Sequence, residues 1–141
     1  GEYTFKDGKV IMRDIDLRIT KYKIIPVGAE GNEYGDSPVI AFWYDTTNKS
    51  DKDTISPSVA WLAAFPNGAV QDIDKNKLNR LQVAMHPDKK LMKDQFAIIK
   101  KGGTVSGAVA YKLADLSAPV KLTAYKGVDG IELGSQEFAV K

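Results

Sequence analysis

The sequence predicts an all-β domain of two stacked antiparallel sheets, and three observations lead to this prediction. In the run 38–47, seven of ten residues are β-branched or aromatic, which is typical of a buried strand. Other segments alternate apolar and polar residues, which places one face of each strand in a core. Turn-forming residues recur at short intervals, without a strand–helix–strand rhythm. We therefore expect an immunoglobulin-like antiparallel β-sandwich of seven to nine strands with one or two short helical turns.

The N-terminal quarter is expected to form a hairpin followed by a long strand. Residues 3–12 read as the hairpin, because both positions of its central Asp7-Gly8 tolerate a positive φ. Residues 14–20 alternate strictly between polar and apolar side chains, as a half-buried strand does. This strand should continue to residue 25 and end at Pro26, which cannot donate to a ladder.

A polar loop and the most apolar strand come next. Residues 28–37 contain three glycines and show no periodicity, which predicts a mobile loop. In the following strand, 38–47, both faces are apolar for most of the length. We expect one face to pack in the core and the other to be covered by a neighbouring element. One face carries Val39, Ala41 and Trp43, and the other carries Ile40, Phe42 and Tyr44.

The stretch after the polar turn 48–53 combines a helix start with strand spacing. Ser56 is a suitable N-cap and Pro57 suits the first helical position, so a single helical turn is expected there. Strand spacing is then predicted from four apolar residues, Val59, Trp61, Ala63 and Phe65. A turn at 66–68 and a short strand at 69–71 complete this part.

Residues 72–101 have the least regular pattern. Two groups fit helical spacing, Leu78, Leu81 and Met85, and then Leu91, Met92, Phe96 and Ile99. His86-Pro87 separates them, which predicts short helical turns inside a long crossover. The remaining strands are expected at 104–113, 120–125 and 136–141, with a hairpin turn at 126–130.

Length and composition indicate one domain, residues 1–141, since no linker or internal repeat interrupts the chain. The chain contains no cysteine, which excludes disulfides, zinc–thiolate clusters and a thiol nucleophile. No apolar run approaches the 18 or so residues that a membrane-spanning helix needs. No cofactor is expected.

The net charge of +2 is unevenly distributed. Residues 1–74 carry a net charge of −4, residues 75–101 carry +6, and the remainder is neutral. The middle segment is either a basic patch for an anionic partner or a solvated, lysine-rich connection. Only one aromatic residue, Phe96, lies among these basic residues, so nucleic-acid binding is not expected.

One short motif resembles a calcium loop. Asp72, Asp74 and Asn76 place oxygen ligands at its first, third and fifth positions. The sixth position needs glycine and the twelfth needs glutamate, and this chain has Lys77 and Val83 there. The departures favour a solvated turn, with metal binding as the alternative.

No catalytic residue is predicted. His86 is the only histidine, and no serine or carboxylate is placed by a motif to form a triad with it. A surface histidine beside Pro87 is the preferred interpretation. Asp14 and Asp16 share a strand face, where paired carboxylates are capable of glycosidic chemistry, but simple alternation on an exposed face explains them.

Aromatic and basic side chains remain as candidate contacts. Trp43 and Trp61 are interpreted as core residues, with exposure as binding anchors the alternative. Tyr34 lies in the glycine-rich loop and is the more plausible exposed contact. The predicted partner contacts are Tyr34, Lys89, Lys90 and Lys93.

Several separated blocks together resemble a known family: 40–50, Ser56-Pro57 with Ala60-Trp61, Gln71-Asp72, 100–105, 108–111 and Gly134-Ser135-Gln136. The chain, from about residue 15 to 141, looks like the domain of unknown function found at the C-terminal end of small lipoproteins from Gram-positive bacteria. The resemblance implies an immunoglobulin-like sandwich tethered outside the cell by a lipid on an upstream cysteine. The family has no established activity, so it supplies no catalytic residues.

The chain begins without methionine, at a Gly1 that reads as a tag remnant. A removed export signal and linker would explain this start, and so would excision of a domain from a cytoplasmic protein. The leading functional expectation is a non-enzymatic module at the bacterial cell surface that binds an unknown protein or cell-wall component. Membrane contact is expected only through the upstream lipid anchor. The alternatives are a structural spacer in an envelope assembly and, less favoured, a hydrolase built around His86.

Overall fold

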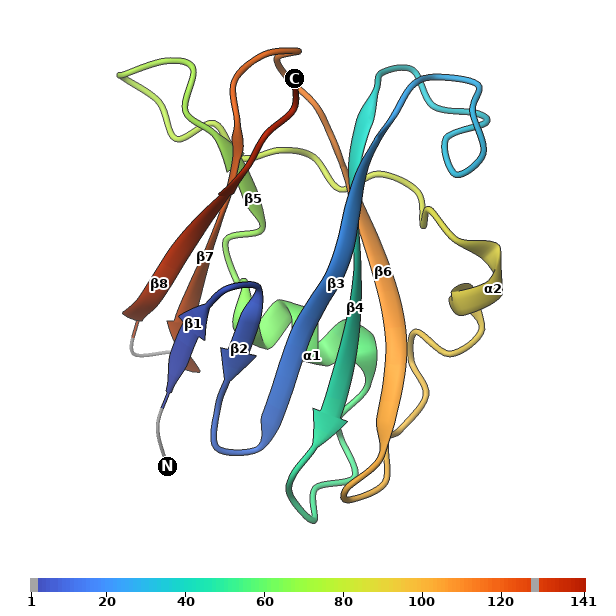
Figure 1. Ribbon diagram of the computed structural model, residues 1–141, viewed down its shortest axis with the longest axis vertical. Helices are drawn as coiled ribbons and strands as arrows, with labels where there is room; N and C mark the ends of the chain where they lie inside the picture. The colour runs from blue at the N-terminus through green and yellow to red at the C-terminus, as the bar shows by residue number, and fades with distance from the viewer. Residues whose placement is uncertain (1–2, 128–129) are drawn as a thin grey trace.

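The computed structural model describes residues 3–127 and 130–141 and is an all-β sandwich of two antiparallel sheets (Figure 1), the class that the sequence predicted. The large sheet has the strand order β1(Thr4–Lys6), β2(Lys9–Ile11), β3(Ile15–Ile25), β4(Val39–Asn48) and β6(Thr104–Lys112). The small sheet has the order β5(Ala69–Gln71), β7(Val120–Lys126) and β8(Ile131–Phe138). Within the described ranges, no helix is long and apolar enough to cross a membrane.

The N-terminal hairpin forms as predicted. β1 and β2 pair in the register Phe5↔Val10, and Asp7 and Gly8 both adopt positive φ angles, 51° and 76°. These are the two positions of a type I′-like turn, whose twist matches that of the flanking strands. The hairpin places Phe5 and Val10 in the core.

β3 changes face in its middle. It pairs with β4 along its whole length, but the register shifts between Ile19 and Lys21, so Thr20 is an extra residue on β3. Side chains have a period of two along a strand, and one extra residue therefore reverses which of them face the core. Ile15, Leu17 and Ile19 face inward before the bulge. After it, Ile24 faces inward and the lysines of this stretch face outward.

The core between the sheets is rich in aromatic side chains. Phe42 on β4 is fully buried and contacts Trp61, Tyr111 and Phe138, with ring centroids 5.0–6.3 Å apart. Trp61 donates a hydrogen bond from its indole Nε1 to the Tyr111 hydroxyl at 2.7 Å. This hydrogen bond satisfies the one donor of the buried indole and fixes the orientation of its ring in the core.

The stretch 59–64 is helical, so the strand predicted there is wrong. α1(Pro57–Ala64) begins at the predicted cap, where the Ser56 side chain accepts a hydrogen bond from Val59 N. Its buried positions include Ala60, Trp61 and Ala64, which lie on one face of a helix. In a strand the same three residues would be divided between the two faces. The alanines and Leu62 later in this stretch are good helix formers, and they extend the expected single turn to eight residues. The helix lies between the two sheets (Figure 1).

The long crossover 72–103 contains one four-residue helix, α2(Lys89–Met92), which agrees with the prediction of short helical turns there. The group at 78–85 does not form the helical turn that its spacing predicted, because part of it pairs with strand edges: Val83 bridges Tyr111 and Arg80 bridges Val70. β8 begins at Ile131, five residues before the predicted last strand. Part of the turn predicted at 126–130 lies outside the described residues.

Candidate binding cleft

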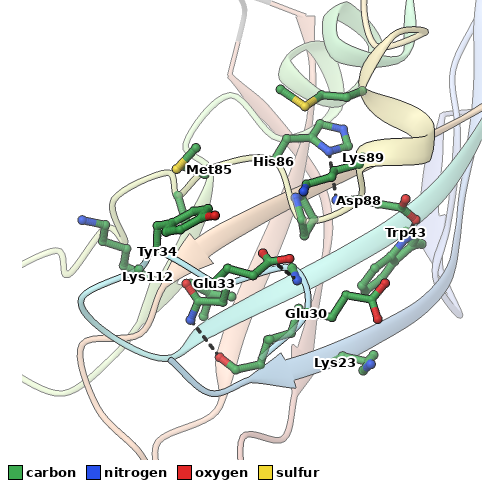
Figure 2. A pocket seen from close by; sticks show the side chains of 18 of the residues that line it. Lys23, Glu30, Glu33, Tyr34, Trp43, Met85, His86, Asp88, Lys89 and Lys112 are labelled. Atoms are coloured by element: carbon green, nitrogen blue, oxygen red, sulfur yellow. Dashed lines mark hydrogen bonds between the residues drawn. The ribbon is translucent and has the colours of Figure 1, made fainter. Parts of the chain in front are cut away.

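A cleft of about 860 Å³ lies on the outer face of the large sheet, the face turned away from the core. Its floor is formed by β3, β4 and β6, and its walls by the loop 26–38 and the segment 84–92. Figure 2 shows side chains from all three parts converging on this space. The volume is in the range of clefts that hold a small molecule or a short peptide segment.

Three rungs of the sheet make the floor. Along them the outward-facing residues are Lys21, Trp43 and Ala108, then Lys23, Ala41 and Ala110, then Ile25, Val39 and Lys112. The alanines of the central rung are almost fully buried, at 0% and 1% exposure. Because these side chains are small, chain segments can pack closely over the sheet. The alanines form a second apolar cluster with Ile25 and Val39, separate from the core between the sheets, and Ala29 and Ala84 pack against it.

The first wall, the loop 26–38, is organised around a buried asparagine. Asn32 donates from Nδ2 to the carbonyls of Ile25, at 3.1 Å, and of Ser37, at 2.9 Å, which joins the two ends of the loop. A Cβ on Gly35 would lie 1.9 Å from the Asn32 side chain, so this contact requires glycine. The sequence predicted a mobile loop from its glycines; the structure gives one of these glycines a packing role instead.

The second wall, the segment 84–92, is attached to the sheet and to the loop. Ala84 N donates to Ala110 O at 2.9 Å, which continues the edge of β6. Farther along, Pro87 meets Gly31 of the loop: a Cβ on Gly31 would lie 2.7 Å from the Pro87 carbonyl oxygen. Gly31 also has a φ of +93°, a conformation that other residues adopt with difficulty. The two walls therefore touch each other above the sheet.

Trp43 links the second wall to the floor. Its indole Nε1 donates to Asp88 Oδ2 at 2.9 Å, and the Lys21 ammonium lies 4.5 Å from the centre of its ring. The other Asp88 oxygen accepts from Lys90 N and caps α2. The hydrogen bond from Trp43 is the main reason why the pKa of Asp88 is lowered, and the backbone bond from Lys90 adds to it.

Both tryptophans were predicted to lie in the core, and the structure confirms this for only one of them. Trp61 is a core residue, 2% exposed, as predicted. Trp43 is half-buried on the outer face and lines the cleft, so its assignment to the core is wrong. The apolar outer face of β4 is covered by neighbouring segments, as expected, but Trp43 is covered only in part.

His86 lies in the second wall and is held in one tautomer. Its Nδ1 accepts a hydrogen bond from Asp88 N at 3.1 Å, so the proton of the neutral ring is on Nε2. Nε2 is buried and has no hydrogen-bond partner among residues 3–127 and 130–141. Burial lowers the pKa of His86, and this outweighs the opposing effect of the neighbouring Asp88. A ring with one nitrogen engaged and the other enclosed is poorly placed for proton transfer to a ligand.

Charges of both signs line the cleft. Lys112 and Asp36 form an ion pair at 3.2 Å, which lowers the pKa of Asp36. Lys23, Lys89 and Lys90 form no ion pair with any described residue. The cleft therefore contains both a neutralised pair and unpaired cations.

The predicted contacts divide between the cleft and the open surface. Tyr34 is 86% exposed and lines the cleft, together with Lys89 and Lys90. Lys93 is exposed but does not line it. Sequence reasoning missed Met85, which is 72% exposed at the same site, because its spacing was taken for that of a helix.

It also missed Lys21, Lys23, Glu30 and Glu33, which line the cleft on the floor and the loop. The lysines are placed there by the bulge at Thr20, which no local pattern in the sequence indicates.

The other candidate residues lie elsewhere. Asp74 accepts from Asn76 N at 2.9 Å, and the Lys77 ammonium lies 3.8 Å from its carboxylate, where a cation would have to bind. Across the part of the chain that the structure describes, no three acidic or histidine side chains gather as metal ligands do. Asp14 and Asp16 form ion pairs with Lys52, at 2.6 Å, and with Lys49, at 2.9 Å.

The chain is similar to known proteins in sequence and in fold. The family described as "Domain of unknown function (DUF5067)" matches residues 1–126. A solved structure described as a putative lipoprotein from Staphylococcus aureus subsp. aureus NCTC 8325 has a TM-score of 0.80 to this chain. It is 22% identical and the similarity covers 99% of this chain and 92% of that one, which shows the shared sandwich fold. No curated protein matches. The chain therefore belongs to the family of this domain of unknown function, the family that the separated sequence blocks resembled.

Proposed function

We propose that this chain is a non-enzymatic binding module of immunoglobulin-like type, and that it holds its ligand in the cleft on the outer face of the large sheet. The observation that carries the proposal is the convergence of exposed aromatic, methionine and unpaired lysine side chains, from three separate segments, on one cleft of about 860 Å³. Aromatic and methionine side chains are enriched in protein recognition sites, and lysines add charge that is complementary to an anionic ligand.

The chemistry of the cleft favours binding over catalysis. Its only histidine uses Nδ1 to accept a backbone hydrogen bond and has Nε2 enclosed. Asp88 has both carboxylate oxygens occupied, by Trp43 and by Lys90 N. These are the groups best suited to acid–base work in the cleft, and each is engaged in holding the wall in place.

The expected location is the outer surface of a Gram-positive cell, with the chain anchored through a lipid on an upstream cysteine. Support comes from the family resemblance and from the S. aureus structure, which is described as that of a "putative lipoprotein". The ligand is then a component of the cell envelope, either a protein or a wall polymer.

The test is capture from envelope fractions of a Gram-positive bacterium by the immobilised chain. We expect the wild-type chain to retain an envelope component, and a variant with Lys23→Glu, Lys89→Glu and Tyr34→Ser to retain at least about tenfold less of it. Lys100→Glu, an exposed lysine that does not line the cleft, is the matched charge control.

Thermal unfolding of all three proteins should confirm that they fold equally well, because every substituted side chain is exposed. Equal capture by wild type and triple variant would refute the cleft as the binding site. A turnover of small substrates that survives His86→Ala but is lost in the triple variant would refute the non-enzymatic assignment.

A further inference from the structure

The two ends of the cleft differ in chemistry, as Figure 2 shows: Tyr34, Met85 and Lys112 lie at one end, and Lys23, Glu30 and Trp43 at the other. At the first end the side chains of Tyr34 and Met85 are 86% and 72% exposed. The charge there is internally neutralised, because Lys112 is paired with Asp36 at 3.2 Å. This end therefore offers an aromatic ring and a polarizable thioether with no net charge, a surface suited to an apolar side chain.

The second end is cationic. Lys21 and Lys23 face outward from adjacent rungs of β3, and α2 contributes Lys89 and Lys90 beside them. None of these four forms an ion pair with a residue in the described ranges. The acids at this end are Glu30 and Asp88, and Asp88 directs both oxygens to N–H donors of the chain itself. An incoming carboxylate would therefore meet free ammonium groups.

We propose that the cleft binds an acidic peptide segment of a protein partner, with an apolar side chain against Tyr34 and Met85 and one or two carboxylates at the lysine end. The proposal rests on the proposed function, since it names the ligand class of the same site. Complementary charge at one end fixes the direction in which the peptide lies, and apolar contact at the other supplies affinity that salt does not screen.

The mixed charge of the lining favours a peptide over an anionic polymer. Four carboxylates line the cleft beside its five lysines: Glu30, Glu33, Asp36 and Asp88. A polymer with a charge on every repeat would bring anions against these carboxylates. A peptide carries its acids at chosen positions and offers backbone N–H groups to the carboxylates elsewhere.

The first experiment is selection from a phage-displayed library of random peptides by the immobilised chain. We expect the enriched peptides to contain Asp or Glu a few residues from an aromatic or large aliphatic residue. Synthetic versions of them should change the fluorescence of Trp43, which lines the cleft, whereas Trp61 is buried and provides a constant background.

The second experiment compares variants by calorimetric titration with the best peptide. Lys23→Glu with Lys89→Glu should weaken binding by about tenfold or more and should remove most of its salt dependence, because it removes the complementary charge. Tyr34→Ser with Met85→Ser should weaken binding by a similar factor and leave the salt dependence intact. Lys100→Glu should change the affinity less than about twofold.

Enrichment of basic peptides, or of none, would overturn the proposal. So would tight binding of long-chain polyphosphate that is lost in Lys23→Glu with Lys89→Glu, which would assign the cleft to an anionic polymer and leave the proposed binding function standing. Envelope capture that is unaffected by cleft substitutions would instead remove the proposed function, and with it this inference.

Discussion

The two faces of β4 make an instructive comparison. Its inner face carries Ile40, Phe42 and Tyr44, all nearly fully buried between the sheets. Its outer face carries Val39 and Ala41, buried under loops, and Trp43, which is half-buried. The inner face is covered by a sheet and a helix along its whole length, whereas the outer face is covered only as far as two loops reach. The cleft lies on this partly covered outer face.

The largest expected contrast between the faces is in stability. Phe42→Ala should lower the free energy of unfolding by about 3–5 kcal/mol, because it opens a cavity among four aromatic rings that cannot collapse to fill it. Trp43→Ala, on the other face of the same strand, should cost clearly less. Urea unfolding followed by circular dichroism measures both. Equal losses would mean that the outer face is as tightly packed as the core.

A pair of glycines tests the contact between the two walls. Gly28 and Gly31 both have φ near +90°, but a Cβ on Gly28 meets nothing within 4 Å, whereas one on Gly31 meets Pro87 O at 2.7 Å. Gly28→Ala should therefore cost only the backbone strain, about 1 kcal/mol. Gly31→Ala should cost about 1–3 kcal/mol more in urea unfolding, since the walls must separate.

The same pair has a spectroscopic readout. Gly31→Ala should shift amide resonances on both walls, including those near Pro87, and Gly28→Ala should shift only its own neighbours. Matching spectra for the two variants would show that the walls do not depend on each other.

Removing a single donor tests how the second wall is attached to the floor. Trp43→Phe keeps an aromatic ring but loses the indole Nε1 and its bond to Asp88 Oδ2, which should cost about 1 kcal/mol of stability. The pKa of Asp88 should rise toward its ordinary value, because that bond is the largest cause of its depression. An NMR titration of the Asp88 carboxyl measures this directly. An unchanged pKa would show that the hydrogen bond does not form in solution.

The smallest expected effect is a pH dependence carried by His86. Its pKa in the folded state is lowered, so below about pH 6.5 the unfolded chain binds more protons than the folded one. Stability from this group is therefore complete above that pH and declines as the pH falls toward the folded pKa. Protonation of Nδ1 also removes the bond from Asp88 N.

Urea unfolding at pH 7.5 and at pH 5.5 measures this decline. A His86→Gln variant should lose less stability than wild type between the two pH values, since His86 is the only histidine in the chain. A wild type that is more stable at pH 5.5 would contradict the sign of the shift.

The alternation along β4 and β6 was predictable from the sequence, because a period of two is a local property, but which face of β4 packs in the core was not. The cap at Ser56-Pro57 gave the correct start of α1. The end of α1 was not predictable in this way, because alanine and tryptophan at 60–64 satisfy helix and strand spacing equally. Only the position of α1 between the sheets decides which one forms.

The cleft depends on contacts that no local pattern encodes. Asn32, Gly31 and Pro87 join segments that are distant in sequence, and Trp43 reaches Asp88 across 45 residues. Tyr34, Lys89 and Lys90 are predicted contacts because loops with exposed aromatics and lysines often bind partners, and the structure places all three in the lining of the cleft. The floor residues Lys21 and Lys23 were missed because strict alternation through β3 would have placed them differently.

Because of the additional residue at Thr20, odd-numbered side chains of β3 face the hydrophobic interior before the bulge and even-numbered ones face it after the bulge. A single strand therefore serves two purposes. A family member whose equivalent strand paired regularly through this point, with no bulge, would turn its counterparts of Tyr22 and Ile24 toward the ligand and lose the basic floor. The bulge would then separate members that select acidic partners from members that select apolar ones.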